Sequence, residues 1–295
     1  MTADTSEPPG GSKPALAPGL YIVATPIGNL RDITFRAVDT LAAADIIACE
    51  DTRVTAKLLA AHDVATAMTA YHEHNAAKER PKLLRRLKAG GAVALVSDAG
   101  TPLISDPGYK LVRAADDAGI AVIPIPGPSA PLAALAVAGL PTDRFLFTGF
   151  LPSRGGPRRK ALLPIAGIGA TLVFFESARR LAGSLADMAE ILGPRPAAIA
   201  RELTKRYEEI RRGRLDALAD HYRIAGAPRG EVVVVVGPPD GPEEDTASDL
   251  DDLLRRALAE MSLRDAAASV SAATGRPRRE VYARALAMTA DSKQP

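Results

Sequence analysis

The sequence predicts an α/β protein with two α/β domains and a short helical end. Through the first half, short apolar runs alternate with stretches of helical spacing, which is typical of a largely parallel sheet. The second half contains a further α/β unit with more antiparallel character. Polar residues recur just after the strands of the first half, as expected for a site built from loops at one edge of a sheet.

The expected elements follow from the positions of the apolar runs. In the first half we expect strands at 20–24, 45–49, 67–71, 92–96 and 121–125, with helices at 34–43, 54–61, 76–89, from 109 onward and after 130. A strand at 145–150 leads into a stretch rich in Pro, Gly and Arg, which we interpret as the crossing between the domains. The second half adds strands at 171–175, 197–200, 207–212 and 231–236, and helices at 178–192 and 215–222.

Shifts in composition divide the chain into five parts. Residues 1–18 are rich in Pro, Gly and Ser without an apolar core, so we expect a disordered leader and not a signal peptide. The N-terminal α/β domain is expected at 19–140 and the C-terminal α/β domain at 141–238. An acidic linker at 239–248 then leads to a small helical domain at 249–295.

The overall composition narrows the function classes. Hydrophobic residues make up 47% of the 295 residues and charged residues 24%, which is typical of a soluble globular protein. Because the net charge is only +2, any nucleic-acid contact depends on local basic patches. The single cysteine, Cys49, excludes an internal disulfide and is expected to be a small buried residue in a reducing cytoplasm. No apolar run approaches the ~20 residues that span a bilayer, so we expect no membrane partner.

The loop at 97–108 connects a strand to a helix and contains two Asp, two Ser, two Gly and two Pro residues. Glycines let a backbone approach a ligand closely, and loops after parallel strands are common ligand sites. Asp, Gly and Pro also form ordinary turns that only cap a helix. We favour a binding loop, because twelve residues are long for a simple connection.

Three short helices are expected at 249–260, 262–274 and 278–288. The last two have the spacing of a helix-turn-helix, with Gly275 in the turn and Arg276, Arg278 and Arg279 near the start of the last helix. A helical cap or dimerisation unit would fit the same pattern, so both interpretations stay open.

Several cofactor and metal motifs are absent from the sequence. The first strand is not followed by G-x-G-x-x-G, and there is no Walker lysine motif, so dinucleotide and nucleoside-triphosphate sites lose their main support. His72 and His74 flank Glu73 but have no further ligands at a suitable spacing. We therefore predict no metal site.

Short motifs occur in a characteristic order along the chain. They are Thr-Pro-Ile-Gly-Asn-Leu at 25–30, Glu-Asp-Thr-Arg at 50–53, His-Glu-His-Asn at 72–75, the loop at 97–108, Pro-Gly-Pro-Ser-Ala at 126–130, Phe-Phe-Glu-Ser at 174–177, Arg-Glu-Leu-Thr-Lys at 201–205 and Gly-Glu-Val at 230–232. Together they resemble the bacterial small-subunit ribosomal RNA (cytidine-2′-O)-methyltransferases of the tetrapyrrole-methylase superfamily. The resemblance covers about residues 20–236, and the family's small helical tail matches the remainder.

This resemblance implies a class III methyltransferase fold that binds S-adenosylmethionine in the cleft between two α/β domains. It also implies a cytoplasmic homodimer acting on the ribose of a cytidine in the decoding region of 16S rRNA. We expect the 30S subunit as the substrate, and free rRNA stays open as the alternative. By motif, the residues that would bind the donor are Pro26, Asp98, Thr101, Ser129, Ala130 and Phe175, with Gly100, Ile104 and Gly127 shaping the pocket.

The chemistry of methyl transfer limits the roles of these residues. The positive charge on the donor sulfur disappears during transfer, so a carboxylate at the sulfur would stabilise the ground state more than the transition state. Asp98 is therefore expected on the ribose or ammonium group of the donor. The candidate bases for the ribose hydroxyl are Glu50, Asp51, Asp106 and Glu176.

Each candidate base also has a purely structural interpretation. Asp51 with Arg53, 106–108, and Glu176 could simply cap helices. In-line positioning of hydroxyl and methyl could also supply most of the catalysis, so the base stays unassigned.

Basic residues in loops are candidates for RNA contact. The predicted contacts are Arg53, Arg154, Arg158, Arg159 and Lys160, and the further candidates are Lys205, Arg206, Arg211, Arg212 and the arginines at 276–279. Two other functions remain open: a small-molecule methylase of the same fold that acts on a tetrapyrrole precursor, and a non-catalytic nucleic-acid-binding module.

Overall fold

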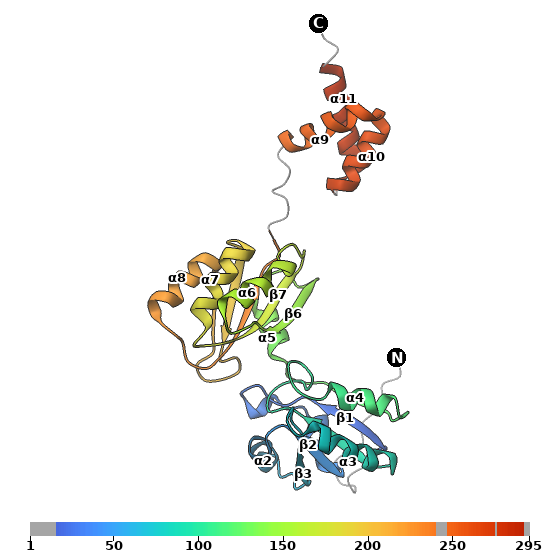
Figure 1. Ribbon diagram of the computed structural model, residues 1–295, viewed down its shortest axis with the longest axis vertical. Coiled ribbons are helices and arrows are strands. Elements are labelled where there is room, and N and C mark those ends of the chain that lie inside the picture. The colour runs from blue at the N-terminus through green and yellow to red at the C-terminus, as the bar shows by residue number, and fades with distance from the viewer. Residues whose placement is uncertain (1–15, 240–246, 275, 292–295) are drawn as a thin grey trace. The chain divides into compact units, whose positions relative to one another are not determined.

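The computed structural model describes residues 16–239, 247–274 and 276–291. The chain forms two compact units that divide between Pro239 and Asp240. Figure 1 shows two sheets with their helices in the first unit and helices alone in the second. Most of the predicted leader, the linker residues 240–246 and Gly275 lie outside the described residues.

The first sheet has five parallel strands in the order β3-β2-β4-β1-β5. In β4, Val93 and Leu95 pack toward α3 and α4, whereas Ala94 and Val96 pack toward α1 and α2. Helices therefore cover both faces, and the predicted parallel α/β half is confirmed. The elements are β1 (Gly19–Val23), η1 (Leu30–Asp32), α1 (Phe35–Ala43), β2 (Ile46–Cys49), α2 (Thr52–Ala61), β3 (Met68–Ala70), α3 (Ala76–Lys88), β4 (Ala92–Val96), α4 (Tyr109–Asp116) and β5 (Val122–Ile125).

Polar side chains cap two helices of this sheet, α1 and α2. The Asp51 carboxylate accepts a hydrogen bond from the Arg53 N–H at 2.8 Å and pairs with the Arg53 guanidinium at 2.6 Å. The cap-and-salt-bridge interpretation of this pair is therefore confirmed. The cap interpretation of Asp106 is wrong, because α4 begins only after Gly108, whose φ of 139° suits glycine alone.

The second sheet is mixed, with the order β6-β7-β10-β8-β9. Strands β6 and β7 are parallel, and the other neighbours are antiparallel, which confirms the predicted antiparallel character. In β10, Val232 and Val234 pack toward α6, α7 and α8, whereas Val233 and Val235 pack toward α5. The elements are α5 (Ala130–Ala138), β6 (Phe145–Phe150), α6 (Gly155–Leu162), η2 (Leu163–Ile165), β7 (Thr171–Ser177), α7 (Leu181–Leu192), β8 (Pro196–Arg201), β9 (Glu209–Arg214), α8 (Leu215–Ala225) and β10 (Glu231–Val236).

Helix α6 occupies the stretch rich in Pro, Gly and Arg that we interpreted as the crossing between the domains, with its basic residues in a loop. Pro157 lies at the third helical position, where a backbone N–H has no partner within the helix. A proline there does not interrupt the helix, so the expectation of a loop is wrong for residues 155–162.

Helix α5 links the two sheets. It follows β5 of the first sheet, yet Ala134, Leu135 and Ala138 pack against the second sheet. The chain therefore changes from one sheet to the other before residue 140, where the domain boundary was predicted. Helix α5 therefore connects the two sheets along the chain, while it packs on the second sheet.

The second unit is a small helical bundle of α9 (Ala247–Glu260), α10 (Leu263–Thr274) and α11 (Arg278–Asp291). Its core contains Leu250, Leu254, Val270 and Val281, and Arg284 on α11 pairs with Asp251 on α9 at 2.6 Å. None of the described helices combines the length and apolar character needed to cross a membrane.

Candidate active site

Three loops meet at the carboxyl edge of the first sheet. The backbones of Thr25 and Gly100 exchange two hydrogen bonds, of 2.9 and 3.0 Å, which join the loops after β1 and β4. The Thr101 hydroxyl donates to the Pro128 carbonyl at 3.1 Å and so joins the loop after β5. A Cβ on Gly127 would lie 3.1 Å from Ala24, so glycine permits this close approach.

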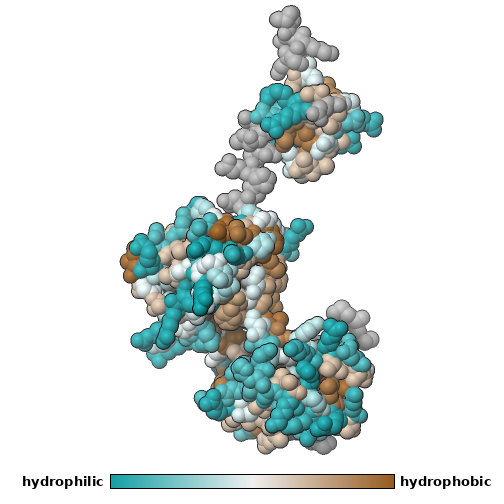
Figure 2. All heavy atoms as spheres, in the orientation of Figure 1, coloured by the Kyte–Doolittle hydropathy of each residue, from teal (hydrophilic) through white to brown (hydrophobic). Residues whose placement is uncertain are grey.

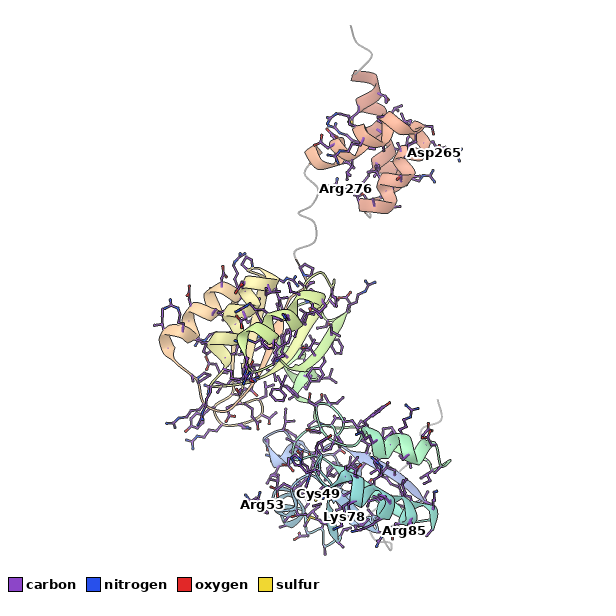
Figure 3. The ribbon with its side chains drawn as sticks, in the orientation of Figure 1. Cys49, Arg53, Lys78, Arg85, Asp265 and Arg276 are labelled. Atoms are coloured by element: carbon purple, nitrogen blue, oxygen red, sulfur yellow. The ribbon has the colours of Figure 1, made fainter. Side chains whose placement is uncertain are left out.

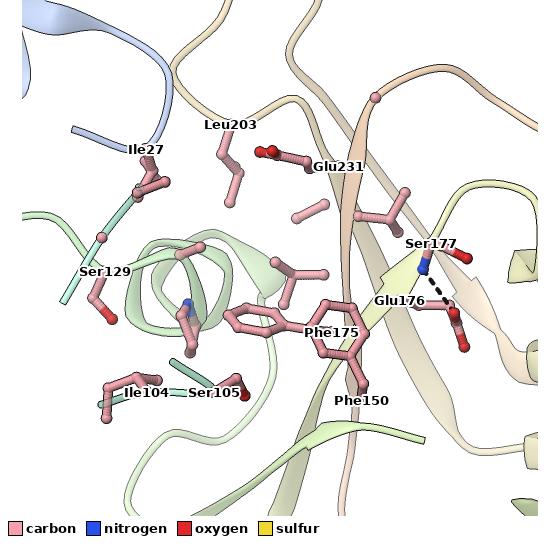
Figure 4. Close-up of a pocket in the computed structure, with 18 of the residues that line it drawn as sticks. Ile27, Ile104, Ser105, Ser129, Phe150, Phe175, Glu176, Ser177, Leu203 and Glu231 are labelled. Atoms are coloured by element: carbon pink, nitrogen blue, oxygen red, sulfur yellow. Dashed lines mark hydrogen bonds between the residues drawn. The ribbon is translucent and has the colours of Figure 1, made fainter. Parts of the chain in front are cut away.

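A cavity of about 390 Å³ lies between these loops and the second sheet. Figure 4 shows Ile104, Ser105 and Ser129 on one side and Glu176, Ser177 and Glu231 on the other. The volume falls in the range of small-molecule sites. The lining residues are Ile27, Ala99, Gly100, Thr101, Ile104, Ser105, Asp106, Ser129, Ala130, Pro131, Phe150, Phe175, Glu176, Ser177, Ala178, Ala200, Leu203, Gly230, Glu231, Val232 and Val233.

Aromatic rings form one wall of the cavity. Phe175 lies edge-on to Phe147, with ring centroids 5.0 Å apart, and tilted against Phe150 at 5.3 Å. A bulge in β6 lies just before Phe150. At this bulge Gly149 has a φ of 67°, and a Cβ on it would lie 2.9 Å from the Ser105 hydroxyl oxygen. The cavity thus offers a flat apolar surface to a planar ligand.

The backbone is strained on both sides of the cavity. Leu103 and Ser105 have φ angles of 73° and 68° and flank Ile104 in the first-sheet loop. Glu202 and Thr204 have φ angles of 51° and 65° and flank Leu203 in the opposite loop. Side chains with positive φ are rare and concentrate at functional sites. In both loops the residue between the strained pair lines the cavity.

The carboxylates near the cavity differ in their partners. Burial raises the pKa of Asp106, and a hydrogen bond from the Ser97 side chain partly opposes this effect. Glu176 is buried and accepts hydrogen bonds from the Ser177 N–H and Arg180 Nε, each at 2.7 Å, and from the Ser184 hydroxyl. Its oxygens are therefore already used within the protein.

Two more carboxylates lie behind the loops and not in the cavity wall. The hydrogen bonds from Arg53 lower the pKa of Asp51 to about 2. Burial, followed by the charges of Asp106 and Asp98, raises the pKa of Glu50. Neither Glu50 nor Asp51 is among the residues that line the cavity.

Most, but not all, of the predicted donor-binding residues line the cavity. Pro26, Asp98 and Gly127 do not line it. The Asp98 carboxylate instead accepts the Asp51 N–H at 2.9 Å, which ties the loop after β4 to the loop after β2. Asp98 thus holds two loops together, and its predicted contact with the donor stays a prediction. The predicted donor-binding residues that do line the cavity are Gly100, Thr101, Ile104, Ser129, Ala130 and Phe175.

The predicted RNA-contacting cluster divides into exposed and buried residues. Arg154 and Lys160 are exposed, and Arg159 is partly exposed beside Asp187 and Glu190. Arg158 is buried, and its Nε donates to Asp187 at 2.6 Å. Since the protein itself encloses this guanidinium, Arg158 is removed from the RNA-facing cluster.

Figure 3 shows Arg53 at the edge of the first-sheet region, where its side chain is 87% exposed.

Sequence reasoning missed several lining residues. Leu203 and Glu231 belong to motifs on which the family resemblance rested, so a signal for them was present, although no role was assigned. Phe150 carried a weaker signal as the end of an apolar strand. Ile27 directly follows Pro26, which was chosen in its place.

Comparisons with known proteins give the family. The model for tetrapyrrole (corrin/porphyrin) methylases matches residues 19–219, and that for the RsmI C-terminal HTH domain matches 244–289. Ribosomal RNA small subunit methyltransferase I of Mesorhizobium japonicum is 57% identical over 272 residues, which cover 92% of each chain. The chain belongs to the tetrapyrrole methylase family. The resemblance drawn from the motifs is thereby confirmed.

One further relative supports the family, and one solved structure shows the fold. Ribosomal RNA small subunit methyltransferase I of Escherichia coli O157:H7 is 45% identical over 269 residues, or 90% of this chain and 94% of the relative. A uroporphyrin-III C-methyltransferase from Thermus thermophilus, solved with S-adenosyl homocysteine, aligns with 74% of this chain and 97% of its own at a TM-score of 0.53. At 22% identity the latter likeness concerns the fold alone, and it confirms the predicted fold class.

Proposed function

We propose that this protein transfers a methyl group from S-adenosylmethionine to the ribose 2′-oxygen of a cytidine in the decoding region of 16S rRNA. The observation that carries the proposal is the cavity built jointly by the loops of one sheet and the strands of the other. Relatives that match nearly the whole chain are named ribosomal RNA small subunit methyltransferase I. A related fold was solved with S-adenosyl homocysteine.

The cavity suits this donor chemically. Phe175 and Phe150 offer rings on which an adenine could stack, and Gly100 leaves room for close approach of the backbone. Ser129, at the start of α5, has no cap hydrogen bond from its side chain, and helix N-termini attract carboxylates such as that of a methionine. When bound, the donor supplies a reactive methyl group on a positively charged sulfur.

We assign the general base to Asp106 among the four candidates. It lines the cavity, and among the described residues no Lys or Arg forms a salt bridge with it. Its raised pKa makes it a better proton acceptor than Asp51. The carboxylate oxygens of Glu176 already accept hydrogen bonds from three donors in the protein, and Glu50 does not line the cavity. The base therefore lies on the same loop as Thr101 and Ile104.

The RNA would be held by exposed cations around this cavity. Arg53, Arg154, Arg159 and Lys160 remain the proposed phosphate contacts, with the 30S subunit in the cytoplasm as the setting. The helical unit would add affinity, since its family model is that of a helix-turn-helix domain.

We also propose that the protein is a homodimer that associates through α5 and β6. Helix α5 is apolar on all sides, and it exposes Leu132 and Val137 in addition to the residues that it buries. Phe145 on β6 is also exposed. Figure 2 shows apolar surface over this region of the first unit. Exposed apolar patches of this kind often mark protein interfaces.

The test is methylation by the purified protein. Labelled S-adenosylmethionine is supplied with 30S subunits, or with free 16S rRNA, from a strain that lacks the gene. Nucleosides are then analysed by mass spectrometry. We expect one 2′-O-methylcytidine in the decoding region. A methyl group on a base, or transfer to a tetrapyrrole precursor with none to rRNA, would contradict the proposal.

A further inference from the structure

The loop at 202–208 between β8 and β9 consists of two consecutive turns. The Lys205 N–H donates to the Glu202 carbonyl at 3.0 Å and closes the first turn, with Leu203 and Thr204 at its tip. The Glu208 N–H donates to the Lys205 carbonyl at 3.1 Å and closes the second turn. Arg206 and Tyr207 lie at the tip of that second turn. One turn therefore contributes Leu203 to the cavity wall, and the next lies directly beside it.

This loop is firmly anchored on both sides. The Lys205 ammonium contacts Glu202 at 2.9 Å and Glu231 at 3.0 Å. The Glu208 carboxylate accepts the Thr204 N–H at 2.7 Å, and the Thr204 hydroxyl accepts the Asn29 N–H of the first-sheet loop at 3.1 Å. The acidic side chains are thus used to hold the loop in place. The side chains of Arg206 and Tyr207, at the tip of the second turn, take no part in these contacts.

Arg206 and Tyr207 are presented to solvent. Tyr207 is 67% exposed, and the Arg206 guanidinium lies 5.8 Å from the centroid of its ring. Within the described part of the chain, Arg206 forms no salt bridge. Arg229 is exposed beside Gly230, which lines the cavity, and its carbonyl accepts a hydrogen bond from Arg201 at the end of β8. Neither Arg206 nor Arg229 forms a salt bridge with a described residue. Both cations and the Tyr207 ring lie in the two loops that contribute Leu203 and Gly230 to the cavity wall.

Resting on the proposed function, we infer that Tyr207 and Arg206 form a stacking site for an unpaired nucleotide of the RNA next to the methylated one. An exposed tyrosine ring gains by covering a base, and unpaired bases are the usual targets of aromatic side chains. The guanidinium retains donors for the phosphate of the same nucleotide. Arg229 would contact the next phosphate. The site thus holds the RNA so that its neighbouring ribose enters the cavity.

The test compares Tyr207→Ala, Tyr207→Phe and Arg206→Ala in the full-length protein. Because both side chains lie on the surface, the thermal unfolding temperature should not change. For a single-stranded fragment of the decoding region, Tyr207→Ala should raise the Kd about tenfold, as expected for the loss of one stacked base. Tyr207→Phe keeps the ring and should bind like the wild type. Arg206→Ala should weaken binding most at low salt and flatten the salt dependence.

Arg85→Ala is the matched control. Arg85 is exposed on α3, which ends just before β4 begins, so it lies at the opposite edge of the first sheet from the cavity (Figure 3). S-adenosylmethionine affinity, measured by calorimetry, should be unchanged in all four variants. An unchanged RNA Kd in Tyr207→Ala, or an equal loss in Tyr207→Phe, would overturn the stacking site. If the wild type does not methylate rRNA at all, the proposed function fails independently of these variants.

Discussion

Single carboxylates in this protein differ in function because their partners differ. Asp51 is committed to Arg53 and the start of α2, and Glu176 to three donors at the end of β7. Asp106 lines the cavity, and its pKa is raised mainly by burial. Three acidic residues that look alike in the sequence therefore have three different tasks. Of these three, only Asp106 lines the cavity without a salt bridge to a described residue, which is why we propose it as the base.

Asp106→Asn should lower kcat by about 10²–10⁴-fold, the usual contribution of a general base. In the wild type the rate should rise as pH passes upward through the raised pKa of Asp106, since only the deprotonated form accepts a proton. This acidic limb should disappear in the variant, whereas S-adenosylmethionine affinity should stay the same. Steady-state kinetics across pH would measure both effects.

The control for this change is Asp116→Asn, on the exposed end of α4. It should keep the wild-type pH profile. An unaltered acidic limb in Asp106→Asn would assign the base elsewhere.

At the scale of elements, buried ionic contacts decide how the helices of the second sheet pack. Arg158 on α6 and Asp187 on α7 are each only 9% exposed at the side chain, and Arg158 also donates to the Gly183 carbonyl. Arg159 reaches the other oxygen of Asp187 at 2.7 Å. Asp187 therefore holds two consecutive arginines of α6 and so fixes α6 against α7.

Asp187→Ala should lower the free energy of unfolding by about 3–5 kcal/mol, because it leaves the buried Arg158 without its counter-charge. Urea denaturation followed by circular dichroism would measure this loss. The comparison is Asp220→Ala on α8, whose pair with Arg223 is about 70% exposed and should contribute less than about 1 kcal/mol. Equal losses in the two variants would show that the α6–α7 contact is not a buried pair in solution.

The sequence predicts those helices and strands whose pattern of apolar residues lies within the segment itself. The apolar runs predicted β4 and β6 at their observed bounds, because the pattern of buried side chains is a property of each segment. It was insufficient where the deciding partner is distant. Arg158 was predicted to contact RNA, because its partner Asp187 lies 29 positions away in the sequence. Asp98 was predicted to contact the donor, because its hydrogen-bond donor, the N–H of Asp51, lies 47 positions earlier. Such contacts exist only once the chain has folded.

At the scale of the whole molecule, the first unit forms its cavity from two sheets that helix α5 connects along the chain. The helix begins at the cavity, where Ala130 and Pro131 line the wall, and it continues over the second sheet. Its outer side carries the apolar residues Leu132 and Val137. Assembly of two copies on this side would therefore act on the same helix that begins at the donor site.

Leu132→Asp together with Val137→Asp should convert the proposed dimer to a monomer, because two charges would be buried in an apolar interface. Light scattering after size exclusion should then give 30.8 kDa, where the wild type gives twice this mass. Ile224→Asp, on the exposed end of α8, should leave the mass unchanged. A wild-type protein that is already monomeric would refute the proposed interface.

Two main-chain hydrogen bonds between Thr25 and Gly100 join the loops after β1 and β4, and the Thr25 hydroxyl adds a bond to the Ser97 carbonyl at 3.1 Å. Main-chain groups are common to nearly all amino acids, so replacement of the neighbouring side chains would leave the two main-chain bonds in place. Evolution could therefore change the side chains around the cofactor, and with them the preferred acceptor, without rebuilding the floor of the cavity. One scaffold could in this way serve substrates as different as a macrocycle and a ribosome.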